Sequence, residues 1–249
     1  MLKIVFLLLF TSSAYAAITN ESEVLLLQTG GNSVVETYNA KTIFSLKKDK
    51  RSYTFSGHYT LGVSEQTDAN GDTEKIESAR NWDALVRYEQ ELNAKLSGFT
   101  ALQYEGDEFA GYKQRQNTDL GLKYILTKTD KINSFVEFGA RYTMEKSTTR
   151  DEDGDDQLDY TKARFYYEFS NKVSKTLSYK FWTEYIPNFT DNEDYLLNFE
   201  PSLSYVLSDT FSLKTAYKGI YDNQPAVSDS GERDEYLDFI FTTSLIAKF

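Results

Sequence analysis

The stretch Lys162-Ala163-Arg164-Phe165-Tyr166-Tyr167-Glu168-Phe169 alternates apolar and polar residues almost without interruption. Its odd-numbered positions hold Ala, Phe, Tyr and Phe, whereas its even-numbered positions hold Lys, Arg, Tyr and Glu. Successive side chains of a β-strand point to opposite faces, so this period of two predicts a strand with one apolar face and one polar face. The same alternation recurs along almost the entire chain beyond residue 16.

Twelve segments of the chain carry this pattern. They are residues 22–29, 34–47, 52–64, 79–91, 95–105, 113–126, 133–145, 160–170, 175–187, 194–206, 211–222 and 235–249. Several are longer than the roughly 9–11 residues that a tilted strand needs to cross a bilayer. The number is also even, as an antiparallel barrel with both chain ends on one side requires. We therefore predict an all-β fold, a transmembrane antiparallel up-and-down β-barrel of about 12 strands formed by residues 17–249.

The first sixteen residues have the layout of a secretory signal peptide. Lys3 precedes an apolar run at residues 4–10, and Ala14-Tyr15-Ala16 forms a small-x-small cleavage site. The apolar run is too short for a membrane-spanning helix, which needs roughly 20 such residues. Residues 1–16 are therefore expected to direct export.

The connections between the segments alternate in length and in charge. The short connections carry nine bases and four acids, and they lie at residues 47–51, 91–95, 127–132, 170–175 and 207–210. The other set carries 23 acids and six bases, and it lies at 64–78, 105–115, 145–159, 187–194 and 222–235, with a tight turn at 29–33. Short turns on one side and long loops on the other are typical of bacterial outer-membrane barrels. A soluble secreted β-sandwich is the alternative fold, but it gives no reason for this segregation.

Aromatic residues on the apolar faces lie near the strand ends, which is typical of the girdles at the two membrane interfaces. Those expected toward the short connections are Phe44, Tyr53, Tyr88, Tyr124, Phe169, Tyr205 and Phe211. Those expected toward the other set are Tyr59, Trp82, Tyr142, Tyr185, Tyr195 and Tyr221.

The final segment alternates up to a terminal phenylalanine, Phe249. Such an ending resembles the C-terminal signal of outer-membrane barrels generally. The expected partners are therefore the barrel-assembly machinery, through this strand, together with outer-membrane lipids and lipopolysaccharide. The expected location is the outer membrane of a Gram-negative bacterium, with both chain ends in the periplasm.

Composition excludes several classes of function. The chain has 38 acids against 27 bases, a net charge of −11, and so lacks the basic excess of a general nucleic-acid binder. It has no Cys, which removes disulfides, thiolate metal sites and cysteine nucleophiles. Its one histidine, His58, has no acid or nucleophile at an obvious fixed spacing. We therefore expect a protein that is not an enzyme, with His58 on the lumen side.

By the same alternation, charged residues of both signs face the inside of the predicted barrel. They are Arg87, Glu89, Asp119, Lys123, Glu137, Arg141, Lys162, Arg164, Glu168, Lys180, Glu184, Glu200, Lys214, Lys218 and Asp238. About eight strands enclose packed side chains, whereas about 16–18 leave an aqueous channel. Twelve lies between, so these residues could brace a plugged interior with ion pairs or line a narrow pore.

Two acidic loops share the spacing D-x-[DN]-G-D, which is found at the start of a calcium loop. The oxygen ligands would come from Asp68, Asn70 and Asp72 in one loop and from Asp151, Asp153 and Asp155 in the other. The bidentate Glu of a calcium loop is missing, because the twelfth positions are Ala79 and Lys162. A weakly bound Ca²⁺ and a simply hydrated acidic hairpin both remain open, and no other cofactor is expected.

Several stretches resemble one known family. They are Thr183-Glu184-Tyr185-Ile186-Pro187-Asn188-Phe189 through Leu203-Ser204-Tyr205, then Tyr217-Lys218-Gly219-Ile220-Tyr221-Asp222-Asn223-Gln224-Pro225, Thr242-Thr243-Ser244-Leu245 and the turn Thr29-Gly30-Gly31-Asn32-Ser33. Together they resemble the YdiY-like salt-induced outer-membrane proteins. The resemblance implies an outer-membrane barrel with a link to salt, and it brings no catalytic or ligand residues with it.

These observations predict an outer-membrane barrel of uncharacterised activity, linked to salt or osmotic stress of the envelope. One alternative is a narrow porin-like channel for small solutes. The other is a cation-binding or adhesive surface that uses the acidic loops.

Overall fold

The computed structural model describes residues 17–29, 35–67, 73–149, 154–225 and 235–249. The predicted signal peptide, residues 1–16, and most of the tight turn at 29–33 lie outside these ranges. Among the described residues, no helix is long and apolar enough to cross a membrane.

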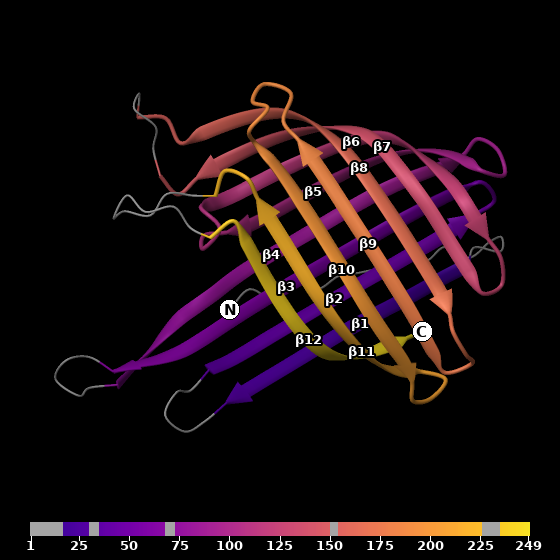
Figure 1. Ribbon diagram of the computed structural model, residues 1–249, viewed down its shortest axis with the longest axis horizontal. Helices are drawn as coiled ribbons and strands as arrows, with labels where there is room; N and C mark the ends of the chain where they lie inside the picture. Colours follow the sequence, from indigo (N-terminus) through magenta and orange to yellow (C-terminus); the bar gives the residue numbers. More distant parts are fainter. Residues whose placement is uncertain (1–16, 30–34, 68–72, 150–153, 226–234) are drawn as a thin grey trace, which may run out of the picture.

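The described residues form twelve β-strands (Figure 1). They are β1 (Ala17–Thr29), β2 (Val35–Lys48), β3 (Arg51–Thr67), β4 (Thr73–Glu91), β5 (Leu96–Asp107), β6 (Tyr112–Lys128), β7 (Ile132–Ser147), β8 (Gln157–Lys172), β9 (Leu177–Pro187), β10 (Tyr195–Val206), β11 (Phe211–Asp222) and β12 (Leu237–Lys248). Each strand pairs antiparallel with its neighbours in sequence, and β1 also pairs with β12, so the sheet closes into a barrel. The predicted twelve-stranded up-and-down barrel is confirmed, and the alternative of a β-sandwich is wrong.

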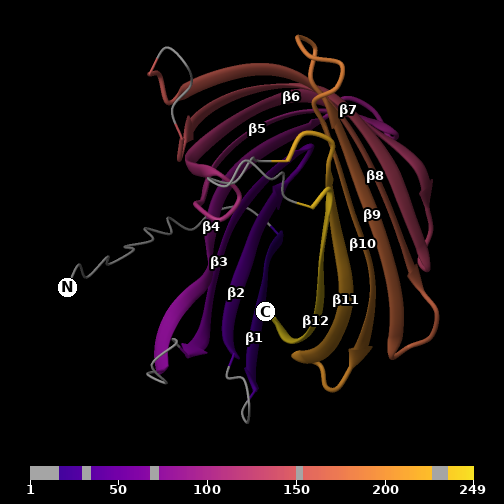
Figure 2. The ribbon, with the colours of Figure 1, turned by 60° about the vertical axis from the view of Figure 1, so that its left-hand side comes forward.

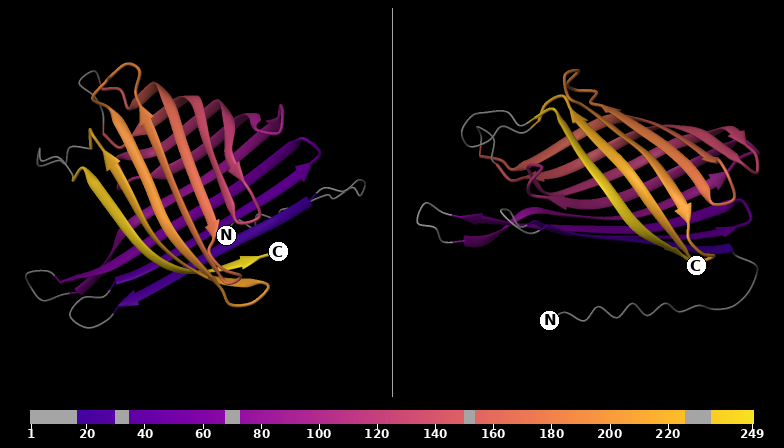
Figure 3. Two further views of the ribbon diagram at one scale, coloured as in Figure 1. Left: turned by 45° about the vertical axis from the view of Figure 1, so that its right-hand side comes forward. Right: turned by 60° about the horizontal axis from the view of Figure 1, so that its bottom comes forward.

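The largest differences from the predicted strand bounds occur in the first four strands. β1 begins at Ala17, five positions before the expected start, because β2 runs far enough to pair Ala17 with Lys47. The expected loop at 64–78 is mostly strand, since β3 continues to Thr67 and β4 begins at Thr73. The hairpins β1–β2 and β3–β4 project well beyond the other strands (Figure 3), and in β3–β4 this follows from the extra strand residues at its tip.

Opposite charges support the projecting end of β3–β4. Glu65 of β3 lies directly opposite Lys75 of β4 in the strand register. Such directly opposed charges stabilise an antiparallel pair. The alternation pattern does not reveal this extension, because both faces of the hairpin are polar there.

Neighbouring residues of one strand show how the two faces of the barrel differ. On β6, Asp119 is 6% exposed, whereas the next residue, Leu120, is 69% exposed. Large apolar side chains are exposed on the outward positions of many strands, including Phe138 of β7 and Phe241 of β12. A closed sheet with a polar inside and a continuous apolar outside is the arrangement that a hydrocarbon environment favours.

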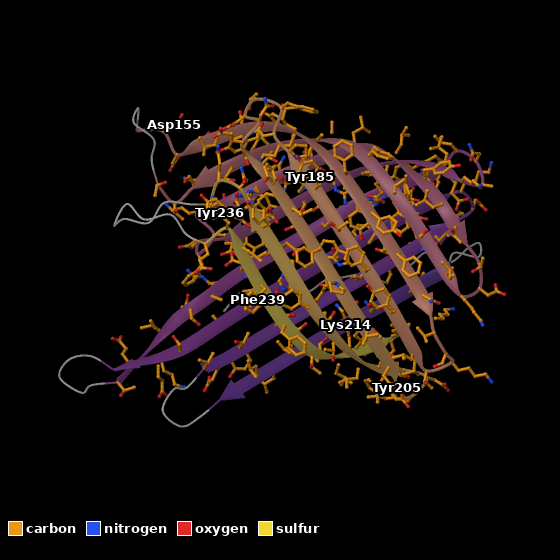
Figure 4. All side chains as sticks on the ribbon, in the orientation of Figure 1. Asp155, Tyr185, Tyr205, Lys214, Tyr236 and Phe239 are labelled. Atoms are coloured by element: carbon orange, nitrogen blue, oxygen red, sulfur yellow. The ribbon has the colours of Figure 1, made fainter. Side chains whose placement is uncertain are left out.

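Aromatic rings form a continuous belt on the outside, toward the longer connections. The ring centroids of Tyr185 and Tyr195 are 5.7 Å apart, those of Tyr195 and Tyr221 are 5.9 Å apart, and those of Tyr221 and Tyr236 are 6.3 Å apart. The belt therefore runs from β9 to the start of β12. Tyr205 lies at the opposite end of the strands, near the short turns (Figure 4). The belt and Tyr205 therefore lie where the two interfacial girdles of aromatic residues are expected.

The closing pair of strands is joined over only part of its length. Residues 21–24 of β1 pair with residues 245–248 of β12, and Asn20 and Phe249 exchange two backbone hydrogen bonds of 2.8 and 2.9 Å. Beyond Val24, β1 continues to Thr29 and pairs with β2 alone. β12 separates from it and follows β11 (Figure 2).

Candidate functional site

A cluster of six charged side chains crosses the inside of the barrel. It contains three arginines and three carboxylates, contributed by β4, β6, β7, β8 and β9. Its members, called here the interior cluster, are Arg87, Asp119, Glu137, Arg141, Arg164 and Glu184. The cluster has no net charge, because its positive and negative side chains are equal in number.

Glu137 is the centre of one half of this cluster. Its side chain is 4% exposed and accepts hydrogen bonds from Arg87 Nη2 and Arg164 Nη1, both at 2.7 Å. Arg87 lies on β4 and Glu137 on β7, with β5 and β6 between them. The contact therefore bridges the interior above the inner face of two intervening strands.

Arg141 organises the other half. Its Nε and Nη2 donate to the two carboxylate oxygens of Asp119 at 2.7 and 2.8 Å, which is a bidentate pair. Its Nη2 also lies 3.6 Å from Glu184 Oε1, and Arg164 Nε donates to that same oxygen at 2.5 Å. Because Arg164 joins both halves, the six groups form one connected network.

An inward-facing phenylalanine supports the arginines. Phe99 of β5 is 3% exposed, and the guanidinium carbon of Arg87 lies 4.0 Å from its ring centroid. A cation over an aromatic face is attracted by the ring quadrupole. Gly121 of β6, which is opposite Gly139 of β7, leaves room for the ring. A Cβ on Gly121 would lie 2.7 Å from Phe99 Cζ and 2.4 Å from the Phe138 carbonyl oxygen.

Sequence reasoning did not find Phe99 as an interior residue. Aromatic residues were expected on the lipid-facing side of the strands, at the two membrane interfaces, and not inside the barrel. The available signal was the pair of glycines at 121 and 139, because two small residues opposite each other on a hairpin indicate a close approach by something else.

Smaller ion pairs continue toward the short turns. Glu89 accepts from Arg87 at 3.0 Å and from Lys123 at 3.3 Å. Lys180 Nζ lies 2.9 Å from Glu168 Oε2. All five of these residues were expected on the lumen side, and the structure places them there.

Another charged group links the first strand of the barrel to its last three strands. Lys214 Nζ on β11 lies 3.1 Å from Glu200 of β10 and 3.4 Å from Glu23 of β1. The hydroxyl of Ser244 on β12 also donates to Glu23. The contact between Lys214 and Glu23 passes over β12, as the contact between Arg87 and Glu137 passes over β5 and β6.

Toward the longer connections, Arg115 forms a similar group. Its Nε donates to Glu145 at 2.7 Å, and its Nη1 lies 3.7 Å from Glu105. Lys162 lies 3.0 Å from Asp194. Sequence reasoning did not include Arg115 and Glu105 among the lumen residues, because they lie at the ends of the predicted strands 113–126 and 95–105, where these meet the expected connection at 105–115. In the structure β5 continues to Asp107 and β6 begins at Tyr112.

Two predicted lumen residues lie outside these groups. Lys218 is half-buried on β11, and Asp238 is exposed at the beginning of β12. Asp238 lies on the part of β12 that has separated from β1, which explains its exposure.

His58 has partners that its sequence neighbours did not reveal. Its Nδ1 lies 3.3 Å from Asp83 Oδ1, and its Nε2 lies 3.0 Å from Thr60 Oγ1 and 2.8 Å from Asn39 Nδ2. Asp83 is directly opposite His58 on β4, and Asn39 is directly opposite Thr60 on β2. Strand register brings these groups together, so no fixed spacing along the chain could show it.

The two acidic loops lie largely outside the described residues. This is true of Asp68, Asn70, Asp72, Asp151 and Asp153. Asp155 is described and exposed, and its Oδ1 accepts a hydrogen bond from the Gln157 backbone at 3.0 Å, which begins β8. In the part of the chain that is described, no group of three acidic, His or Cys residues is arranged to hold a metal ion.

Exposed pairs lie at both ends of the barrel. Near the short turns, Lys47 Nζ is 2.6 Å from Glu91 Oε1. On the projecting hairpins, Lys75 Nζ is 3.1 Å from Glu36 Oε1, and this hydrogen bond lowers the pKa of Glu36 and raises the pKa of Lys75. Exposed pairs of this kind contribute little to stability.

Two cavities open on the short-turn side of the interior. One has a volume of about 430 Å³, and Lys41, Glu23, Glu200 and Lys214 are among its lining residues. The other has a volume of about 480 Å³ and is lined in part by Lys123. Both are therefore bounded by charged groups.

The sequence matches the family described as "Protein of unknown function, DUF481" over residues 25–249, and the chain belongs to that family. No curated protein matches it. This bears out the resemblance to the YdiY-like proteins, which are members of the same family.

Solved structures show a similar fold. A structure of the NanC porin is 11% identical, covers 93% of this chain and 98% of its own, and has a TM-score of 0.51. The KdgM porin in complex with disordered oligogalacturonate is 9% identical, covers 93% of this chain and 96% of its own, and has a TM-score of 0.45. The likeness to NanC is one of fold, and the barrel thus resembles an outer-membrane porin.

Removing the carboxylate of Glu137 should destabilise the barrel strongly. In Glu137→Gln, Arg87 and Arg164 lose their shared counter-charge inside the barrel, and a cost of about 3–5 kcal/mol is expected. Urea unfolding in lipid vesicles, followed by the change in gel mobility between folded and unfolded barrel, measures this. Glu91→Gln removes an exposed partner and should cost at most about 1 kcal/mol. Equal losses in both variants would contradict the role assigned to the interior cluster.

Gly121→Ala should destabilise the barrel through steric overlap. The new Cβ would meet the Phe99 ring and a backbone oxygen, and overpacking of this kind costs about 1–3 kcal/mol or more. The matched control is Gly98→Ala, because a Cβ there meets no atom within 4 Å. The same unfolding measurement should show Gly98→Ala close to the parent. If Gly98→Ala lowers the free energy of unfolding as much as Gly121→Ala does, steric overlap with Phe99 is not the cause of the loss.

Proposed function

We propose that this member of the DUF481 family is an outer-membrane β-barrel that forms a narrow channel for ions and small solutes. The observation that carries the proposal is the interior cluster, in which guanidinium groups and carboxylates from strands that are not adjacent meet across the lumen. A barrel braced in this way restricts passage along its axis without filling its interior completely.

The outside of the barrel supports a membrane location. An apolar surface surrounds the strands, and aromatic residues lie toward both ends of it. Exposing such a large apolar surface to water is energetically unfavourable, whereas contact with the hydrocarbon of a membrane is not. The short turns and both described chain ends lie on one side, which we assign to the periplasm, and the acidic connections lie on the other.

The inside supports a narrow route rather than a wide pore. The two cavities on the short-turn side are bounded by charged groups that water can reach. Above them, Arg87 and Glu137 narrow the interior, because their side chains meet across it at 2.7 Å. Because the cluster is neutral, it should limit the size of a solute more than its charge.

A channel is also favoured over an enzyme. The group around His58 places Asp83 on one ring nitrogen and the hydroxyl of Thr60 on the other. However, Asn39 lies within hydrogen-bonding distance of both the ring and that hydroxyl, so the polar groups satisfy one another. We therefore assign this group to the structure of the wall.

Planar-bilayer recording tests the proposal. The parent should show small stepwise currents, and the pair variant Arg141→Ala with Asp119→Ala should raise the unit conductance roughly twofold or more, because it removes a bidentate pair from the constriction. Removing both members of the pair avoids leaving a single buried charge. Lys47→Ala with Glu91→Ala at the rim is the control and should conduct like the parent. No stepwise current from either the parent or the pair variant, with both shown to be folded by gel mobility, would refute the channel.

We further propose that the channel is linked to salt, and that this link acts through the acidic entrance formed by the longer connections. The longer connections carry 23 acids against six bases, which should concentrate cations at that entrance at low ionic strength. The distance over which these charges act, the Debye length, falls from about 10 Å at 0.1 M salt to about 3 Å at 1 M. The preference for cations should therefore weaken as the salt concentration increases. Reversal potentials in a potassium chloride gradient, measured at low and at high mean concentration, test this. An anion preference, or a cation preference that does not change with salt, would contradict it.

A further inference from the structure

The seam between β1 and β12 is open over most of the length of the two strands. Residues 25–29 of β1 and 237–244 of β12 lie beyond the last paired residues, Val24 and Leu245. Among the described residues, these two edges have no strand beside them on the seam side. Figure 2 shows the two strands separating toward the longer connections.

Both edges contain a run that is apolar at outward and inward positions alike. β1 contains the unbroken apolar run Val24-Leu25-Leu26-Leu27, and β12 contains Phe239-Ile240-Phe241. In each run the inward positions, Leu25 and Leu27 on β1 and Ile240 on β12, are apolar as well as the outward ones. The two apolar runs therefore lie on either side of the same gap.

The exposure of the inward apolar residues of β12 depends on whether the seam beside them is paired or open. Ile246 of β12 lies in the paired part and is 3% exposed. Ile240 is on the same face of the same strand, and it is 49% exposed, as is Leu27 across the gap. The difference follows from the separation of the strands, because both isoleucines occupy equivalent positions in the alternation.

A polar region lies directly below this apolar wall. Along the inner face of β1, the position before Leu25 is Glu23, which contacts Lys214 and lines the cavity of about 430 Å³. Successive inward positions are about 6.6–6.8 Å apart. The interior therefore changes from apolar to charged within one or two positions, which matches a molecule with an apolar tail and a polar head.

The opening is continuous with the outer apolar surface. The outward neighbours of the gap, Leu26, Phe239 and Phe241, are among the most exposed apolar residues of the barrel. Tyr236, directly before β12, belongs to the aromatic belt, so the gap lies just inside one interface (Figure 4). In the proposed membrane, the molecules that meet this gap are lipids.

We propose that the open part of the seam is a lateral opening through which the acyl chain of a membrane amphiphile reaches the inside of the barrel. The chain lies between Leu27 and Ile240, and the polar head lies over the cavity beside Lys214. Water inside the barrel hydrates the free strand edges, which hydrocarbon alone could not do. This inference rests on the proposed membrane location and is independent of conduction along the axis.

Quenching of tryptophan by lipid tests the opening. The background variant replaces Trp82 and Trp182 by Phe, and the reporter is Ile240→Trp in vesicles of phosphatidylcholine with brominated acyl chains. Phe241→Trp, which faces outward, should be quenched strongly. Leu85→Trp, which faces inward on β4, should be quenched little. We expect Ile240→Trp to be quenched nearly as much as Phe241→Trp, and quenching no greater than that of Leu85→Trp would overturn the proposal.

A reversible lock shows whether the acyl chain enters by the seam. The chain has no Cys, so the pair Leu26→Cys and Thr243→Cys, which would be opposite if the register of the seam continued, can form a single disulfide. Closing it should lower the quenching of Ile240→Trp, and reduction should restore it. The control pair, Ser22→Cys with Ala247→Cys, lies in the paired part and should leave quenching unchanged. Quenching that persists with the seam locked would overturn the proposal.

Two further variants remove ambiguities. If Ile240→Trp fails to fold, as judged by gel mobility, Leu27→Trp reports from the other side of the gap. Leu26→Cys alone tests for a second copy of the chain at the free edge, because that arrangement would link two chains when oxidised. Such a dimer in the membrane would assign the gap to strand pairing between copies and overturn the lipid proposal. Quenching without stepwise current would refute only the axial channel.

Discussion

Backbone hydrogen bonding in a closed ring of antiparallel strands is the constraint on which the rest of this structure depends. A sheet that faces hydrocarbon must pair its N–H and C=O groups within itself, and closure removes most of the free edges. Closure also divides every strand into an inner and an outer face. On β6, for example, Asp119 and Leu120 are neighbours in sequence but belong to different environments. The acidic, polar average composition and the apolar exterior are therefore two results of one arrangement.

Most of the fold could be predicted from the sequence, because a period of two is a local signal. The twelve strands and their inward charged residues follow from it, and Arg164 and Phe165 show both faces in two adjacent letters. Features that depend on register could not be predicted in this way. The partners of His58 and the contact of Arg87 with Glu137 come from strands whose relative position is set by pairing, not by spacing. The extended β3–β4 hairpin was missed because its two faces are both polar.

The interior cluster differs from a collection of separate ion pairs. Arg164 contacts carboxylates of β6, β7 and β9, so no single hairpin can satisfy it. Buried charges are costly unless they are fully paired. The network therefore favours one register for β4 to β9 together, since a slip of one residue would turn its members toward the outside. Charge inside the barrel thus specifies the arrangement of strands as well as narrowing the passage.

The contact between Glu23 and Lys214 joins residues that are 191 positions apart, and the one between Glu23 and Ser244 spans 221. Hairpins form over short distances along the chain, whereas closing a loop of this length carries a larger entropic cost that only later contacts repay. The two end strands should therefore be the last to meet during folding. Before that step, the nascent sheet would have two long free edges, each able to pair with another chain. The protein is most vulnerable to aggregation in that interval, and a helper that shields both edges would act at this step.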